Sequence, residues 1–175
     1  NRVVVRRHLI EPRPQKTSNA PPLPDDYPWP QALLPNSLQV IDFVTRAIRG
    51  GGRVYGCNLL DHVRRYPFLR AEAVKDTETV SAFLEATWQG IGLPDGLMMD
   101  NDAVWNGGGR GQRTLSHIVR LCLLLGIQVI FTPPDTPTAN PVAESFNDLW
   151  QSNFWSRTEF RDLAHVQTEL LLFEH

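Results

Sequence analysis

Three acidic residues occupy positions where packing alone does not explain a carboxylate: Asp42, Asp100 and Glu144. Asp42 lies within the apolar stretch "SLQVIDFVTRAI", whose pattern predicts a central strand covered on both faces. Asp100 ends the short apolar stretch "GLMMD" and enters a glycine-rich loop, the kind of strand end where ligand sites gather. Glu144 lies early in a predicted helix after a proline-rich loop. A mixed sheet with packed helices can bring these three positions together.

Each carboxylate also has an ordinary structural interpretation. Asp42 could form a salt bridge with an arginine such as Arg46, Asp100 could be a turn residue, and Glu144 could be a solvated residue favoured by the helix dipole. Asp42 is the most informative of the three, because burying a bare carboxylate costs several kcal/mol. It must therefore be paired, hydrogen-bonded or bound to a cation.

The chemistry that three converging carboxylates favour is phosphoryl transfer. No serine, cysteine or lysine nucleophile lies between them in the predicted site, and oxygen ligands suit hard divalent cations. Two such ions can activate the attacking oxygen on one side of a phosphodiester and stabilise the leaving oxygen on the other.

The elements that must position these acids alternate in a recognisable way. Three strands come first and should pair antiparallel, and the later strands are separated by helices and should be parallel. The expected fold is α/β, with a five-stranded mixed sheet flanked by helices. Ser156 and Glu159 predict a capping box for the last helix. The predicted strands lie at 37–48, 54–60, 61–74, 96–100 and 127–132, and the helices at 76–92, 112–125, 141 onward and 156 onward.

Composition divides the chain into two parts. Residues 1–36 are basic and proline-rich and should form a linker or a strap, whereas residues 37–175 should form the globular core. The first residue is Asn and the last residues fall in a predicted helix, so we expect a domain excised from a longer protein. The 42% hydrophobic and 21% charged content is that of a globular protein, and neither a membrane-spanning run nor a signal peptide is evident. We expect a cytoplasmic location and no membrane partner.

Three motifs in sequence order, "VIDFVT", "MMDND" and "TANPVAESFN", resemble those of the DDE transposase/integrase catalytic core, the retroviral-type integrase core domain that bacterial insertion-sequence transposases share. The resemblance covers roughly residues 37–173. It implies an RNase H-like fold and Mg²⁺- or Mn²⁺-dependent DNA strand cleavage and strand transfer. It also implies that Asp42, Asp100 and Glu144 are the catalytic residues and hold two metal ions.

The same resemblance implies partners and a setting. The DNA partners would be transposon ends and target DNA, and the chain would form a homodimer or higher oligomer. The protein would be bacterial and associated with the nucleoid when bound to DNA. Asn140, four residues before Glu144, matches a polar position that touches DNA in the family.

The chain departs from the family pattern at two positions. Asp102 stands where the family usually has glycine, and it could add a metal ligand or distort the turn that aims Asp100. Gln151 stands where many relatives carry a basic residue that meets DNA, so DNA contact is expected to shift to Arg110 and Arg113.

Two alternatives remain open at this point. Asp61 resembles another acidic position of the family and competes with Asp42 as the first carboxylate, although the strand around Asp42 matches better. The departures at Asp102 and Gln151 also allow a catalytically inactive or domesticated core that acts in DNA binding or self-association.

Overall fold

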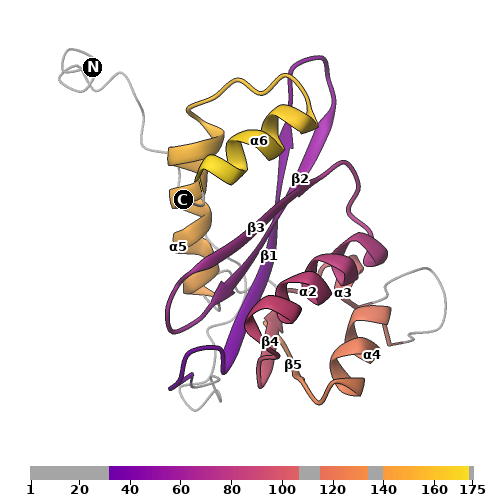
Figure 1. Ribbon diagram of the computed structural model, residues 1–175. Helices are drawn as coiled ribbons and strands as arrows, with labels where there is room; N and C mark the ends of the chain where they lie inside the picture. Colours follow the sequence, from indigo (N-terminus) through magenta and orange to yellow (C-terminus); the bar gives the residue numbers. More distant parts are fainter. Residues whose placement is uncertain (1–31, 107–114, 134–139, 174–175) are drawn as a thin grey trace.

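The computed structural model describes residues 32–106, 115–133 and 140–173, and its centre is a five-stranded sheet (Figure 1). The strand order is β3-β2-β1-β4-β5. β1 pairs antiparallel with β2, β2 antiparallel with β3, and β4 parallel with both β1 and β5. The predicted α/β class and mixed sheet are therefore confirmed. The strands are β1 (Leu38–Ala47), β2 (Arg53–Asp61), β3 (Pro67–Glu72), β4 (Gly96–Met99) and β5 (Gln128–Phe131).

Helices cover both faces of this sheet (Figure 1). α2 and α4 pack on one face, around a core that includes Ile41, Leu59 and Trp88. α5 and α6 pack on the other, where Val44 and Trp150 belong to an aromatic-rich core. The helical elements are α2 (Thr77–Ile91), α3 (Ala103–Asn106), α4 (His117–Leu124), α5 (Pro141–Trp150), the π-helical turn η2 (Gln151–Trp155) and α6 (Leu163–Phe173).

The ends of α2 follow its sequence signals. The side chain of Asp76 accepts a hydrogen bond from the backbone N–H of Thr79, which satisfies one of the donors left free at a helix start. Gly92 ends the helix with φ of 86°, a conformation that glycine adopts without steric cost. α2 therefore spans the predicted segment.

α5 also begins as its sequence predicts. Asn140 is the N-cap, and its side chain accepts from the N–H of Ala143 at 3.2 Å. Pro141 takes the first helical position, where its missing N–H costs nothing. These signals place Glu144 in the first turn of the helix.

The start of the last helix differs from the prediction. Ser156 ends η2, in which α5 widens into π-helical geometry, and its N–H donates to the carbonyl of Gln151. α6 begins only at Leu163, where the carboxylate of Asp162 accepts from the N–H of His165 at 2.8 Å. The predicted capping box is therefore wrong.

The middle of the chain differs in detail. A short helix, α3, occupies part of the segment expected to be a loop after Asp100. α4 begins later than expected, because Ser116 caps it and leaves Leu115 outside and 58% exposed. Within the described ranges, no helix is long and apolar enough to cross a membrane.

Candidate functional site

Asp42 and Asp100 lie at the same level of two neighbouring parallel strands. β1 and β4 pair Val40 with Met98, and each aspartate follows two residues later. Burial raises the pKa of Asp42, and the negative charge of Asp100 raises it further. Hydrogen bonds from the N–H of Phe43 and from Asn147 oppose this rise. The parallel pairing thus brings two of the three predicted carboxylates into electrostatic contact.

Glu144 approaches the same place from α5. The residue is exposed in the first turn of the helix. Partial burial raises the pKa of Glu144, and the negative charges of Asp148 and Asp42 add to the rise. The charge of Asp42 therefore interacts with the charges of both Asp100 and Glu144.

Two asparagines that the sequence analysis did not single out support Asp42. Nδ2 of Asn147 donates to Oδ2 of Asp42 over 2.7 Å, and Nδ2 of Asn58 donates to Oδ1 of Asn147 over 2.9 Å. Asn58 is fully buried in β2. The signal that could have found it is an amide within the apolar strand "VYGCNLL", because such a group needs a partner.

The turn after β4 holds Asp100 in a fixed orientation. Oδ1 of Asp100 accepts from the N–H of Asp102 at 3.0 Å and from Nε1 of Trp105 at 2.6 Å. Trp105 is fully buried and stacks on Phe43, with ring centroids 5.0 Å apart. Phe43, which follows Asp42, thereby packs on Trp105, which orients Asp100.

Asp102 is held by Lys75 from the segment between β3 and α2. Their Nζ and Oδ2 atoms are 2.5 Å apart, and Nζ lies 4.5 Å from the ring centroid of Phe43. Burial pushes the pKa of Asp102 upward, but the hydrogen bonds from Lys75 and from the N–H of Val104 outweigh it and lower the pKa. Asp102 is thus part of an ordered turn and an ion pair.

The donor chemistry at Asp42 fits a hard cation, whereas the arrangement of donors is only partly suitable. Oxygen ligands are present, and the mutual repulsion of Asp42 and Asp100 is what a cation would relieve. However, within the residues that the structure describes, no three acidic, histidine or cysteine side chains are close enough together to hold one ion. Asp100 and Glu144 each interact with the charge of Asp42, but the three carboxylates do not form a closed metal site.

The other predicted site residues have different positions. The side chain of Asn140 is engaged as the α5 cap, and Nε2 of Gln151 donates to Oγ of Ser156 at 2.7 Å. Arg110 and Arg113 lie outside the described residues.

Asp61 has a turn-forming environment. It pairs with Gln39 at the start of β1, and its two oxygens accept from three backbone N–H groups, those of Asn36, Val63 and Arg64. The bonds from Val63 and Arg64 close the turn between β2 and β3, and the bond from Asn36 ties this turn to the segment before β1. The geometry thus places Asp61 among backbone donors, in contrast to Asp42, which lies among other carboxylates.

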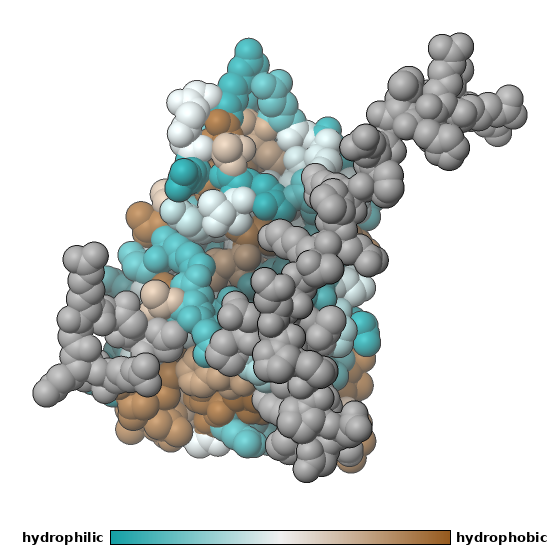
Figure 2. All heavy atoms as spheres, turned by 180° about the vertical axis from the view of Figure 1, so that it is seen from behind, coloured by the Kyte–Doolittle hydropathy of each residue, from teal (hydrophilic) through white to brown (hydrophobic). Residues whose placement is uncertain are grey.

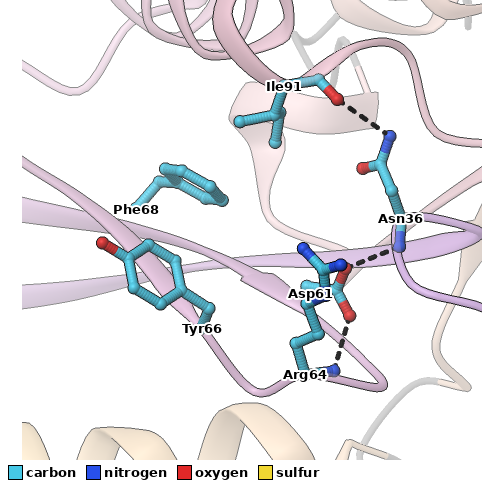
Figure 3. Close-up of a pocket in the computed structure, with 6 residues that line it drawn as sticks. All are labelled: Asn36, Asp61, Arg64, Tyr66, Phe68 and Ile91. Carbon is cyan, nitrogen blue, oxygen red and sulfur yellow. Dashed lines mark hydrogen bonds between the residues drawn. The ribbon is translucent and has the colours of Figure 1, made fainter.

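A cavity of about 420 Å³ opens beside this turn (Figure 3). The rings of Tyr66 and Phe68 form one wall, and Ile91 at the end of α2 faces them. Asn36 closes the rim by donating to the carbonyl of Ile91. The cavity lies beside the start of β1, where Gln39 pairs with Asp61.

The comparison with solved structures supports the fold class. No family model matches the chain. The chain is similar to a chain in the cryoEM structure of the simian T-cell lymphotropic virus intasome in complex with PP2A regulatory subunit B56 gamma, with a TM-score of 0.63 and 16% sequence identity. The match covers 83% of this chain and 51% of the viral one, so this chain spans about half of its length. This likeness is one of fold, and it agrees with the predicted RNase H-like α/β class.

Proposed function

We propose that this chain is a DDE transposase/integrase catalytic core that cleaves DNA strands and transfers them to a target. The observation that carries the proposal is the parallel register of β1 and β4, in which Asp42 and Asp100 each follow the paired residues Val40 and Met98 by two positions. The charge of Asp42 also acts on Glu144 in the first turn of α5. The likeness to an intasome chain supports it, because the fold is one on which such a site can be built.

In this proposal the three carboxylates would hold Mg²⁺ or Mn²⁺, as a pair of ions. When bound, the ions supply charge stabilisation and an activated oxygen nucleophile. The residues of the chain provide orientation: Asn147 fixes Asp42, and Trp105 fixes Asp100. Glu144 reaches the site from the exposed first turn of α5, where no hydrogen bond to its carboxylate is seen in the described part of the chain.

The proposal is tested by nicking of supercoiled plasmid DNA in Mn²⁺. Asp42→Asn, Asp100→Asn and Glu144→Gln should each lower the nicking rate at least about 100-fold, because each removes a charge from the site. Glu85→Gln, an exposed acid on α2, is the matched control and should cleave as the wild type does. Full activity in any of the three variants would remove that residue from the proposed site.

DNA and a second copy of the chain are the partners that we propose. An exposed leucine surface supports self-association: Figure 2 shows hydrophobic atoms gathered along the edge of the molecule where α4 lies. The leucines at and beside α4, with their exposed fractions, are Leu115 (58%), Leu123 (55%), Leu124 (85%) and Leu125 (40%). Such a surface is typical of protein interfaces.

A second candidate function is an inactive core that binds DNA or associates with itself. It is favoured by the lack of any three potential ligands near enough to share an ion within the described ranges. Calorimetric titration of Mn²⁺ into the wild type and Asp42→Asn separates the candidates. Binding that is lost in the variant supports the enzyme, and absence of binding with or without DNA supports the inactive core.

A further inference from the structure

A chain of two side-chain amides connects the interior of the sheet to Asp42. Asn58 lies directly opposite Asp42 in the antiparallel register of β1 and β2. It does not bond Asp42; its Nδ2 donates to Asn147 on α5, which donates in turn to Asp42. Three separate elements therefore meet in one hydrogen-bonded chain.

The direction of this chain follows from the charge of Asp42. An ionised carboxylate only accepts, so Asn147 must turn its NH₂ group toward Asp42 and its oxygen away. That oxygen then requires a donor, and Asn58 supplies one. The consequence is visible at the far end, where Oδ1 of Asn58 is buried and has no hydrogen-bond partner in the part of the chain that the structure describes. Turning Asn58 round would place two amide oxygens against each other.

We propose that Asn58 is a positioning residue that fixes the amide of Asn147, so that its NH₂ group faces Asp42. The inference rests on the proposed function, in which the orientation of Asp42 matters to the reaction. Asn58 itself touches no reacting atom. Hydrogen-bond partners one step behind a catalytic ligand typically change activity by about 10- to 100-fold when removed.

The first measurement is hydrogen exchange of the Asn147 side-chain NH₂ group by NMR. In the wild type the group should be protected, and Asn58→Leu should accelerate its exchange about 10-fold or more, because Asn147 is then free to rotate. Gln39→Met is the matched control: Gln39 is equally buried and bonds Trp88 and Asn36 at the start of β1. This control should leave the Asn147 signal unchanged.

The second measurement is the rate of plasmid nicking in a double-mutant cycle. Asn58→Leu and Asn147→Leu should each lower the rate about 10-fold. If Asn58 acts only through Asn147, the double variant should be no slower than Asn147→Leu alone. If the variants instead act by a general loss of packing, their effects on the nicking rate should add in the double variant, and Gln39→Met should also lower the rate.

The outcomes separate the two proposals. Unchanged exchange of the Asn147 amide in folded Asn58→Leu, or additive losses in the cycle, would overturn the positioning role. A wild type that does not nick DNA, with exchange that responds as described, would reject the proposed function and leave the positioning role supported. If Asn58→Leu fails to fold, Asn58→Ser replaces it, because serine is small and polar but too short to bond Asn147. The same results then support or overturn the positioning role.

Discussion

At the scale of single residues, Asp42 opposes the stability of the fold that holds it. Burial and the charge of Asp100 raise its pKa, and the hydrogen bonds from Phe43 and Asn147 offset this only in part. An acid whose pKa is raised on folding favours the folded state below its unfolded pKa, and this contribution is lost as the pH rises through its folded pKa. Ionised Asp42 therefore destabilises the protein at neutral pH.

Asp42→Asn should raise the melting temperature at pH 7 while it abolishes activity. Asparagine carries no charge and keeps one acceptor oxygen, so it retains one of the two hydrogen bonds that Asp42 accepts, at Oδ1 from Phe43 and at Oδ2 from Asn147. The expected rise is roughly 2–4 °C, the shift that about 1 kcal/mol causes in a domain of this size. The difference should shrink toward pH 4, near the ordinary value of 3.8, because Asp42 is then increasingly protonated. Calorimetry at both pH values checks this, and a lower melting temperature for the variant at pH 7 would contradict it.

At the scale of elements, β2 lies so close to the end of α5 and to η2 that only glycine fits at position 56. A Cβ on Gly56 would lie 2.7 Å from Cη2 of Trp150 and 2.9 Å from both Cζ2 of Trp155 and Cγ2 of Val44. These side chains belong to the aromatic core under α5 and α6. The contact fixes the distance between α5, which carries Glu144 and Asn147, and the sheet, which carries Asp42.

Gly56→Ala should therefore destabilise the fold by about 1–3 kcal/mol, the usual cost of overpacking a core. The cause is the forced movement of two tryptophan rings, so the variant should also alter tryptophan fluorescence and lower the nicking rate by shifting α5. Gly90→Ala is the control, because it lies in α2 with nothing within 4 Å and should be neutral or slightly stabilising. Urea unfolding measures the free energy of unfolding of both variants, and equal values for the two would refute the close packing at Gly56.

Elements with strong local signals could be predicted from sequence. Asn140 and Pro141 define the start of α5 because capping and a fixed φ are local properties. The start of α6 could not be predicted, because α5 continues as the π-helical η2, and Ser156 ends η2 instead of beginning a helix. In this geometry the rings of Trp150 and Trp155 pack against each other, a tertiary contact without a local signal.

The same limit applies to the candidate site. Asp42 stood out because a carboxylate in an apolar strand demands a partner, but its partner Asn147 lies 105 residues away and has no local signature. Lys75 likewise meets Asp102 only through the fold. Spacing identifies which groups need partners, and tertiary structure decides which partners they obtain.

At the scale of the whole molecule, each of the two helical layers leaves a pair of leucines exposed. The layer with α4 presents Leu123 and Leu124, 55% and 85% exposed, whereas α6 in the other layer presents Leu171 and Leu172, 63% and 69% exposed. Either helix could bury apolar area between two copies. Helical periodicity does not distinguish a core face from an interface, so the sequence alone does not choose between the two helices.

Leu124→Glu should convert a dimer into a monomer if α4 is the interface, because it places a charge at the centre of an apolar contact. Its fold should be unaffected, since the side chain makes little contact within one copy. Light scattering after gel filtration measures the mass, with unchanged melting of the monomer as the check on folding. Leu172→Glu is the comparison on α6 and should leave the dimer intact. A dimer lost only with Leu172→Glu would move the interface to α6, and a wild type that is monomeric at about 100 μM, well above the Kd of a stable dimer, would reject both.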